Sequence, residues 1–380
     1  MKSHNLKKYK YLIVGAGFFG SVVAERVASF KKEKVLVIDK RDHVGGNSYS
    51  RTDPATGIEV HKYGTHIFHT DNLSTWNYIK PFMTLNPYRH RVFTTYKNSV
   101  YGMPINLDTI NRFFGLTLRP HEAREFIRNE IAKERITHPE NLEEKAISLM
   151  GRSLYEAFIK GYTLKQWGTD PKDLPADTIT RLPFRTNYNS DYYDDPVQGV
   201  PIEGYDTVFE KLLSHHNITL ATDVDYFRIK DRVPGHMVTV FTGPIDSFFC
   251  YKHGELGWRT IDFSEERFDI DDYQGTAVNN YAEVSVPFTR IHEFKHLHPE
   301  REYKQGKTLI YKEFSRQAER EDYRFYPINR SEDVERLRMY DRERVKNVFF
   351  GGRLGRYRYL DMDDTITEAL LFFEKKLKNL

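Results

Sequence analysis

Three glycines close to the N-terminus have the spacing of a loop that binds a diphosphate. Gly15, Gly17 and Gly20 follow a short apolar run and precede an amphipathic stretch. The first glycine allows a tight turn, the second lets the backbone approach a pyrophosphate, and the third lets a helix pack closely on a strand. The amino end of that helix attracts the phosphate charge. Asp39 ends the next apolar run, where ribose hydroxyls would bind, so the segment predicts a dinucleotide site.

Further glycines favour FAD over NAD. Arg41 is followed by Gly45, Gly46 and Asn47, which resembles the extension in FAD proteins of the glutathione-reductase and amine-oxidase type. In those proteins the extra glycine pair makes more phosphate contacts. Residues 351–353, with the sequence Gly-Gly-Arg, precede the last predicted helix and fit the same plan, in which the chain returns to cover the flavin. An NAD domain does not need these segments.

Two histidines follow the flavin signature. His66 and His69 lie in the segment Gly64–Thr70, which ought to return to the cofactor. The sequence leaves two interpretations open for each histidine. It lies beside the flavin, or it is a hydrogen-bonded residue of the core.

One pattern resembles a zinc site. His292, Glu293 and His296 have the spacing in which two histidines on one helical face bind zinc with a glutamate as base. The flanking residues, however, alternate as in a strand, where the two histidines would stand ~13 Å apart. No metal is therefore predicted at this motif.

Two more patterns are weak. Residues 306–308, Gly-Lys-Thr, resemble part of a phosphate loop, but Arg301 stands where that loop needs a glycine, so a turn is expected. Asp191, Asp194 and Asp195 form an acidic cluster, which we expect to be a solvated loop, with a lone metal site as the open alternative.

The elements that must position these residues follow from the apolar pattern. Continuous β-branched runs at 11–14 and 35–38 flank the first predicted helix, which makes a βαβ unit with strands buried on both faces. Helices are predicted over 120–134, 141–165 and 363–377, a loop over 181–204, and a strand over 347–350. Residues 238–241 and 278–298 alternate as in an antiparallel sheet.

The predicted fold class is α/β, an FAD-binding Rossmann-like domain with an inserted helical bundle and an antiparallel β-sheet domain. We expect the FAD-binding domain to comprise residues 1–80, 205–250 and 340–380. The helical domain, with a mobile lid, is expected at 105–180, and the antiparallel sheet domain for the substrate at 83–104, 185–204 and 255–335.

Composition excludes several classes of protein. The formal charge is +3 over 380 residues, too small a field to indicate nucleic-acid binding. The single cysteine excludes a disulfide framework, and no apolar run approaches the ~20 residues that cross a bilayer. A cytoplasmic protein without membrane insertion is expected. The 25 tyrosines and 26 phenylalanines suit a pocket with flat walls and polar tips.

Several long motifs together resemble the bacterial UDP-galactopyranose mutases. The matching segments are residues 61–70, 141–149, 160–167, 288–293, 351–354 and 359–362, so the resemblance runs along nearly the whole chain. It implies interconversion of UDP-galactopyranose and UDP-galactofuranose, for polysaccharide of the cell wall, by covalent catalysis through N5 of reduced FAD without net redox change.

The resemblance also implies roles for individual residues. Arg181 and Arg290 match the pair that stabilises the departing UDP, and Arg181 lies in the lid. Aromatic residues match those that line the uridine and sugar, and tyrosines match those that bind the diphosphate. The implied catalytic residues are Arg181, Arg290, His66 and His69. The implied substrate-binding residues are Phe158, Tyr162, Thr163, Trp167, Arg181, Tyr192, Arg259, Asn280, Arg290, Tyr326 and Tyr359. The implied cofactor-binding residues are Gly15, Gly17, Phe19, Gly20, Asp39, Lys40, Gly46, Asn47, Gly64, His66, Ile67, Val224, Gly352, Arg353, Asp361, Met362 and Thr365.

By the same resemblance, the expected partners are UDP-galactose in both ring forms and a reductant such as NAD(P)H, and the expected assembly is a homodimer. His69 favours plain galactose over the N-acetylated sugar. Two alternatives stay open. An FAD-dependent oxidase or dehydrogenase of an amine or alcohol would share the nucleotide-binding half, and a flavin-binding structural or sensor protein would have no use for the paired arginines.

Overall fold

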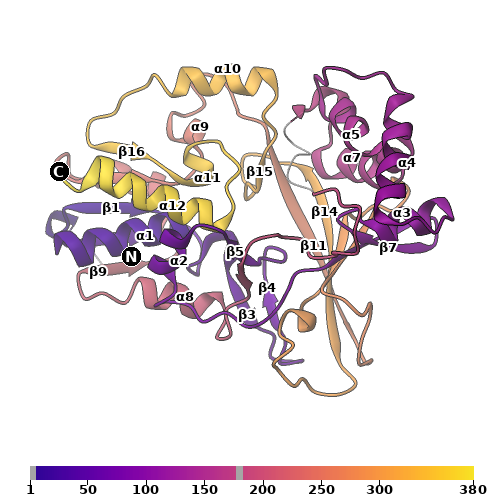
Figure 1. The fold of residues 1–380 in the computed structure, drawn as a ribbon. Helices are drawn as coiled ribbons and strands as arrows, with labels where there is room; N and C mark the ends of the chain where they lie inside the picture. The colour runs from indigo at the N-terminus through magenta and orange to yellow at the C-terminus, as the bar shows by residue number, and fades with distance from the viewer. Residues whose placement is uncertain (1–5, 177–182) are drawn as a thin grey trace.

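The structure, a computed structural model, describes residues 6–176 and 183–380 (Figure 1). Its first layer is a parallel sheet in the order β16–β10–β1–β2–β9. The strands are β1 (Tyr11–Val14), β2 (Val35–Ile38), β9 (Ile218–Ala221), β10 (Val238–Phe241) and β16 (Val348–Phe350). Strand β2 is buried along its whole length, as expected for a strand covered on both faces. The predicted βαβ unit and the predicted strand near residue 348 are confirmed.

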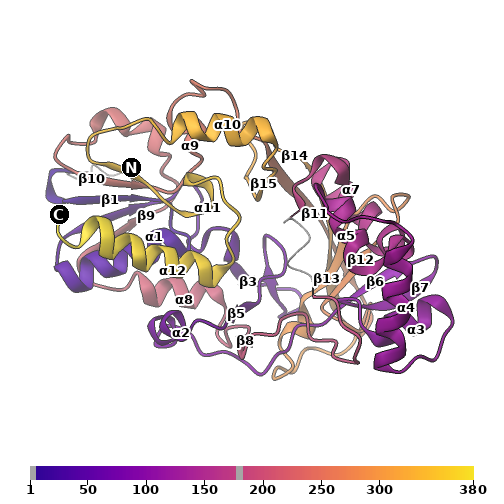
Figure 2. The same ribbon diagram turned by 45° about the horizontal axis from the view of Figure 1, so that its top comes forward.

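Helices from both ends of the chain cover this sheet. Helices α1 (Phe18–Arg26) and α12 (Met362–Phe372) lie side by side, and the rings of Phe19 and Phe372 are 5.4 Å apart (Figures 1 and 2). Helix α8 (Tyr205–Leu212) lies beside α1. The C-terminal helix therefore packs against the helix that follows the glycine loop.

The second layer is a seven-stranded sheet in the order β15–β11–β14–β13–β12–β6–β7. Its strands are β6 (Val92–Tyr96), β7 (Ser99–Met103), β11 (Trp258–Phe268), β12 (Val278–Tyr281), β13 (Arg290–Glu293), β14 (Thr308–Gln317) and β15 (Tyr326–Pro327). All neighbouring pairs are antiparallel except β12 and β6, which are parallel. These two strands come from distant parts of the chain, so no hairpin fixes their relative direction.

A helical lobe caps the far end of the second sheet (Figure 2). It contains α3 (Leu107–Phe114), α4 (Pro120–Ala132), α5 (Leu142–Met150), α6 (Arg152–Leu154) and α7 (Gly161–Trp167). The expected helical lobe is confirmed, but residues 141–165 do not form one continuous helix, because α5 ends before Gly151 and the chain resumes with α6 and a π-helical turn (Tyr155–Lys160). Gly151 has a φ of 81°, a conformation that stops a helix and that side chains with a Cβ rarely adopt.

Two more expectations are corrected. Strand β10 lies between β16 and β1 in the parallel sheet and not in an antiparallel one. All four of its residues are buried, and a pattern of four residues does not determine strand direction. The stretch 181–204 contains β8 (Val197–Gly199), which pairs with β5 (Phe68–Thr70), so it is not all loop.

The remaining α-helices and β-strands connect these layers or extend them. They are β3 (Ser50–Thr52), β4 (Glu59–His61), α2 (Leu73–Ile79), α9 (Ile245–Phe248), α10 (Ser331–Tyr340) and α11 (Gly352–Gly355). Among the described residues, none of the helices has the length and apolar character to span a membrane.

Candidate active site

The first glycine loop leaves the amino end of α1 open. Helix α1 begins after Gly17, and no side chain caps its first amides. A Cβ on Gly20 would lie 1.9 Å from the carbonyl oxygen of Gly15, so only glycine lets the helix approach the strand this closely. The first turn of α1 therefore offers N–H groups to an anion.

The other two glycine turns meet this loop. A Cβ on Gly46 would lie 3.2 Å from the Cα atom of Gly17, and a Cβ on Gly351 would lie 2.2 Å from the ring of Phe19. The three turns form a cradle of bare backbone at a helix amino end. This cradle fits the pyrophosphate of a dinucleotide, because side chains would fill the space.

Asp39 and the residues around it hold the shape of the cradle. Its carboxylate accepts hydrogen bonds from the backbone N–H of Ala16 at 2.7 Å and of Arg41 at 2.9 Å. The Val224 N–H donates to the Asp39 carbonyl at 2.9 Å, and the Arg41 guanidinium donates to Asn47 Oδ1 at 2.8 Å. Burial lowers the pKa of the neighbouring Lys40. These predicted cofactor residues converge on one region.

The C-terminal cofactor residues lie on the other side of the same loop. The Arg353 guanidinium donates to the carbonyl oxygen of Phe325 at 3.2 Å and lies 4.7 Å from the centre of the Tyr359 ring. Asp361 precedes α12, and its carbonyl accepts the hydroxyl of Thr365 at 2.8 Å. Gly352 begins α11, and Met362 begins α12.

His66 is held in one tautomer. Its Nδ1 lies 2.7 Å from the Gly64 carbonyl oxygen, which can only accept, so Nδ1 carries the hydrogen. Burial lowers the pKa of His66 to about 4, so the ring is neutral at pH 7 and Nε2 has a free lone pair. The charges of Arg353 and Glu313 act on this ring, so His66 lies near both of these side chains.

His69 makes a different contact. Its Nδ1 lies 2.5 Å from Asp195 Oδ2, and its ring stacks on Tyr193 with centres 3.7 Å apart. The ring of His90 stacks on Tyr193 with centres 5.9 Å apart and meets Tyr192 edge-on at 5.3 Å, and burial lowers the pKa of His90 to about 3. Asp191 pairs with Arg91 and Asp194 with Arg185. The acidic cluster is thus divided among separate cations, which argues against a shared metal site.

Arg290 is the central cation among the side chains that the second sheet places in the candidate site. It lies 3.2 Å from Glu313 Oε1 and donates to the hydroxyl of Tyr162. Burial raises the pKa of Glu313, but Arg290 and His292 outweigh it and lower this pKa to about 2. The ion pair is therefore fully charged at neutral pH.

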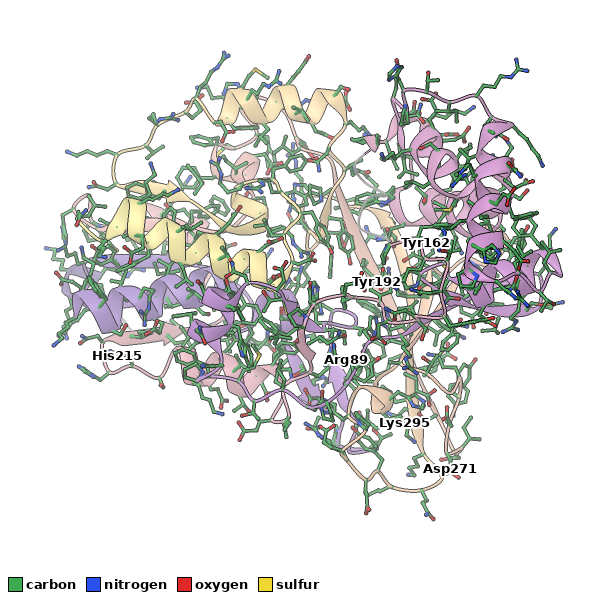
Figure 3. The ribbon with its side chains drawn as sticks, viewed as in Figure 1. Arg89, Tyr162, Tyr192, His215, Asp271 and Lys295 are labelled. Carbon is green, nitrogen blue, oxygen red and sulfur yellow. The ribbon has the colours of Figure 1, made fainter. Side chains whose placement is uncertain are left out.

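Tyrosines surround this arginine. The charge of Arg290 acts on Tyr162, Tyr192 and Tyr326, and Figure 3 shows Tyr162 and Tyr192 close together between the helical lobe and the sheets. The ring of Tyr326 stacks on Tyr359 at 5.7 Å and meets Trp167 edge-on at 6.2 Å. The structure therefore brings most predicted substrate residues together with the predicted flavin side.

Other predicted substrate residues have contacts of their own. Arg259 is buried and donates to the carbonyl oxygens of Gln166 and Lys165 at the carboxyl end of α7, and burial lowers its pKa to about 10. Phe158 is 3% exposed and packs edge-on against Tyr96, Tyr101 and Phe113. Thr163 is buried in α7, and Ile67 is buried beside β5. Arg181 lies outside the described residues.

Asn280 faces Arg290 across the β12–β13 pair. The Asn280 Oδ1 and Arg290 Nε atoms are buried and have no hydrogen-bond partner among the described residues. The unpaired Asn280 Oδ1 is costly unless a ligand donates to it, whereas Arg290 Nε faces the Glu313 carboxylate at 3.2 Å as an ion pair without hydrogen-bond geometry.

The zinc-like motif is split. His292 contacts Glu313, whereas His296 lies near Asp272 and Glu293. The Glu293 carboxylate is already bonded to the N–H groups of Tyr273 and Gln274. The two histidines thus belong to different clusters. The expected strand is only partly confirmed, because β13 ends at Glu293 and His296 lies in a 3-10 helix (Phe294–Leu297).

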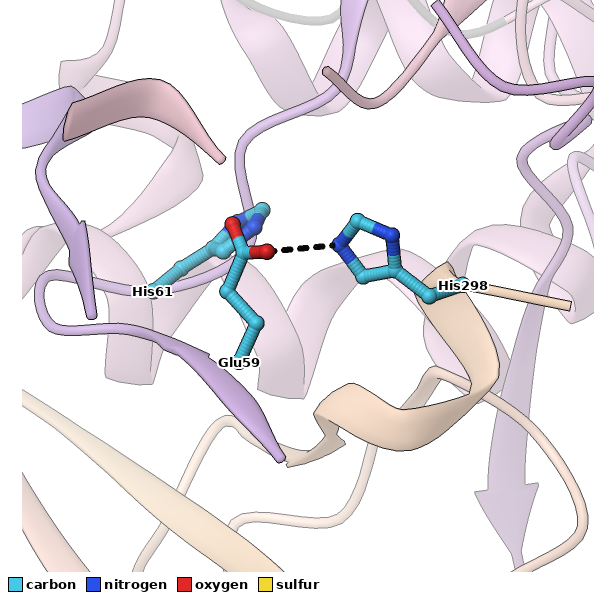
Figure 4. A group of neighbouring side chains, drawn as sticks. All are labelled: Glu59, His61 and His298. Carbon is cyan, nitrogen blue, oxygen red and sulfur yellow. Dashed lines mark ion pairs between the residues drawn. The ribbon is translucent and has the colours of Figure 1, made fainter. Parts of the chain in front are cut away.

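A third cluster contains Glu59, His61 and His298 (Figure 4). His298 Nε2 lies 3.2 Å from Glu59 Oε2, but Arg301 lies 2.7 Å from the same oxygen. His61 Nδ1 accepts the N–H of His66, so the hydrogen of the neutral ring is on Nε2. A guanidinium on the carboxylate and a hydrogen on the facing nitrogen both oppose metal binding.

Sequence reasoning assigned none of three further polar residues its role in this structure. Glu313 and His292 are buried beneath Arg290, and Lys165 donates to the carbonyl oxygens of Tyr281, Val286 and Phe288. The sequence did contain a signal for Glu313, because it is an acidic residue on the inward face of a long apolar strand. Lys165 carried no such signal, because its acceptors are backbone atoms.

Comparisons with known proteins agree with this geometry. Residues 157–359 match the family model described as UDP-galactopyranose mutase, and residues 13–82 match that of an NAD(P)-binding Rossmann-like domain. The chain is 44% identical over 362 residues to a probable UDP-galactopyranose mutase of Klebsiella pneumoniae, covering 94% of this chain and 92% of that protein. It is 40% identical over 378 residues to a dTDP-fucopyranose mutase of Escherichia coli, covering 97% and 99%.

Solved structures show the same fold. A crystal structure of reduced UDP-galactopyranose mutase superposes with a TM-score of 0.74 at 13% identity, over 98% of this chain and 94% of that one. A putative protoporphyrinogen oxidase from Exiguobacterium superposes with a TM-score of 0.63 at 11% identity, over 97% and 99%.

Proposed function

The chain belongs to the UDP-galactopyranose mutase family, and we propose that it interconverts UDP-galactopyranose and UDP-galactofuranose with reduced FAD. The observation that carries this proposal is the position of Arg290. This fixed cation lies among tyrosines, between the glycine cradle and the helical lobe, where the diphosphate of a nucleotide sugar needs a counter-charge. Reduced FAD, when bound, supplies the nucleophile that displaces UDP from the sugar.

The protein side chains stabilise the leaving group and orient the sugar. Arg290 donates to the diphosphate as negative charge develops on UDP, and Asn280 Oδ1, a buried acceptor without a hydrogen-bond partner among the described residues, can accept from a substrate hydroxyl. Tyr326 and Tyr359 form a flat wall beside them. Arg181 is proposed as the second arginine of the pair.

His66 is suited to proton transfer. Its neutral ring has Nδ1–H fixed on Gly64, which leaves Nε2 to accept the proton of the sugar hydroxyl that attacks as the ring recloses. In the opposite step the protonated ring gives this proton to the ring oxygen, which becomes a hydroxyl as the ring opens. His69 is already bonded to Asp195 and is proposed to hold the loop of residues 187–195 beside the flavin.

The 40% identity to a dTDP-fucopyranose mutase makes dTDP-fucose the second candidate substrate. The two substrates differ at the base, the ribose 2′-hydroxyl and the sugar 6-hydroxyl. The test is anaerobic incubation of the dithionite-reduced protein with UDP-galactofuranose and, separately, with dTDP-fucopyranose, followed by chromatography. We expect efficient conversion of UDP-galactofuranose. Preferential conversion of the dTDP sugar would change the substrate, and substrate oxidation would favour the oxidase alternative.

Several further properties are proposed from the family resemblance. The protein acts in the cytoplasm as a homodimer, and NAD(P)H reduces its FAD. The domains are those expected from the sequence, with residues 1–80, 205–250 and 340–380 holding the flavin. Size-exclusion chromatography with light scattering tests the dimer, and anaerobic bleaching of the flavin by NADH and NADPH tests the reductant.

A further inference from the structure

His292, the first histidine of the zinc-like motif, lies in the middle of a buried hydrogen-bond chain. Its Nδ1 lies 2.7 Å from Thr65 Oγ1, and its Nε2 lies 3.0 Å from Glu313 Oε2. The other carboxylate oxygen of Glu313 lies 3.2 Å from Arg290 Nε. The chain thus connects Thr65, in the loop between β4 and β5, with the cation of the candidate site on the neighbouring strands β13 and β14.

The hydrogen atoms in this chain have one direction. Glu313 is ionised and can only accept, so the hydrogen between it and His292 lies on Nε2. Burial lowers the pKa of His292 more than Glu313 raises it, so the ring is neutral and its Nδ1 has a lone pair. The Thr65 hydroxyl therefore donates to Nδ1. Thr289 donates to Glu313 Oε1 at 3.0 Å, and Arg290 Nε contacts the same oxygen at 3.2 Å as an ion pair without hydrogen-bond geometry.

We propose that His292 is a positioning residue that links the Gly64–His66 loop, through Glu313, to the orientation of Arg290. The inference depends on the proposed function, because it assigns Arg290 to the nucleotide sugar. Glu313 is 2% exposed, so water cannot replace a lost donor easily. Without the His292 hydrogen bond the carboxylate would rotate, and Arg290 would lose its fixed direction.

Two substitutions of His292 test the hydrogen bond that its Nε2 donates to Glu313. In His292→Gln the amide nitrogen can stand near the position of Nε2 and donate to Glu313, whereas in His292→Asn the shorter amide cannot reach it. We expect His292→Asn to lower kcat/KM about ten- to a hundredfold and to weaken binding of UDP to the holoenzyme. His292→Gln should recover most of both. His296→Gln, the other histidine of the motif, is the matched control and should behave as wild type.

The tautomer of His292 can be measured, and the result distinguishes a positioning role from a purely structural one. The ¹⁵N shifts of His292 in the wild-type holoenzyme should show a neutral ring with hydrogen on Nε2, and Thr65→Val, but not Thr65→Ser, should change the Nδ1 shift and weaken UDP binding. This pair also decides the matter if His292→Asn does not fold.

The outcomes are distinguishable from those of the proposed function. A reduced wild type that converts no nucleotide sugar would overturn both. Suppose the wild type converts the sugar but His292→Asn binds UDP with unchanged affinity. That result would overturn this inference alone. If His292→Asn does not fold, unchanged UDP affinity in Thr65→Val would do the same. Hydrogen on Nδ1 would also contradict it.

Discussion

The two sides of the candidate site use different parts of the chain, backbone atoms on the cofactor side and side chains on the substrate side. The cofactor side is a cradle of backbone atoms from three glycine turns at the amino end of α1. The substrate side is made of side chains from α7, β13, β14 and β15, with Arg290 and Glu313 at its centre. A backbone site depends on which residues lack a Cβ, whereas a side-chain site depends on which strands become neighbours. The two sides should therefore fail in different ways.

The largest effect is expected on the substrate side. Arg290→Ala removes the only described cation that donates to Tyr162, and we expect kcat/KM to fall about a hundred- to a thousandfold, with the flavin still bound. Activity and the flavin absorbance spectrum measure the two effects. Arg320→Ala, an exposed arginine paired with Glu255, is the control. Loss of flavin from Arg290→Ala would show that the two sides are not separate.

The converse failure is expected on the cofactor side. Gly20→Ala places a Cβ 1.9 Å from a backbone oxygen that cannot move alone, so we expect loss of flavin and about 1–3 kcal/mol of stability. Flavin content after gel filtration and urea unfolding measure this. A Cβ on Gly235 meets nothing within 4 Å, so Gly235→Ala is the matched control. A Gly20→Ala protein that keeps its flavin and loses only UDP binding would break the comparison.

A smaller effect is expected from the partner of the arginine. Glu313→Gln keeps the shape but removes the charge that faces Arg290 at 3.2 Å. We expect kcat/KM to fall about tenfold, less than for Arg290→Ala, with normal flavin content. A larger loss than that of Arg290→Ala would mean that the carboxylate has a role of its own.

The smallest effect is a pH dependence shared by both sides. Burial lowers the pKa of His61, on the cofactor side, and of His90, on the substrate side, each to about 3. The unfolded chain takes up protons below about pH 6.5 while the folded protein does not, so stability should fall as the pH drops from 6.5. Glu59 and Glu313 each have a pKa of about 2, because their basic neighbours lower it more than burial raises it. These two carboxylates therefore add to the loss of stability only below about pH 4.5.

Thermal unfolding between pH 8 and pH 5 checks this prediction. We expect the midpoint to decrease below pH 6.5. His236→Gln, at an exposed position, should leave the slope unchanged. A flat profile down to pH 5 would show that the two buried rings are protonated in the folded protein.

The same contrast explains what the sequence could predict. The glycine cradle and Asp39 were predictable because a turn, a strand and a helix amino end are encoded within one short segment. Arg290 was found through the family resemblance, but Glu313 and His292 were not, since their partners come from other strands and from the loop at Thr65. The orientation of β10 and the break at Gly151 were missed because short strands and helix ends depend on tertiary neighbours.

The central claim is that a flavin protein of this fold uses Arg290 and its surrounding tyrosines for a nucleotide sugar and not for net oxidation. The most direct test is to mix dithionite-reduced protein with UDP-galactofuranose under nitrogen and to measure both products and remaining reductant. The account predicts many turnovers to UDP-galactopyranose with no consumption of reductant. Stoichiometric oxidation of the sugar, or activity only in the oxidised protein, would contradict it.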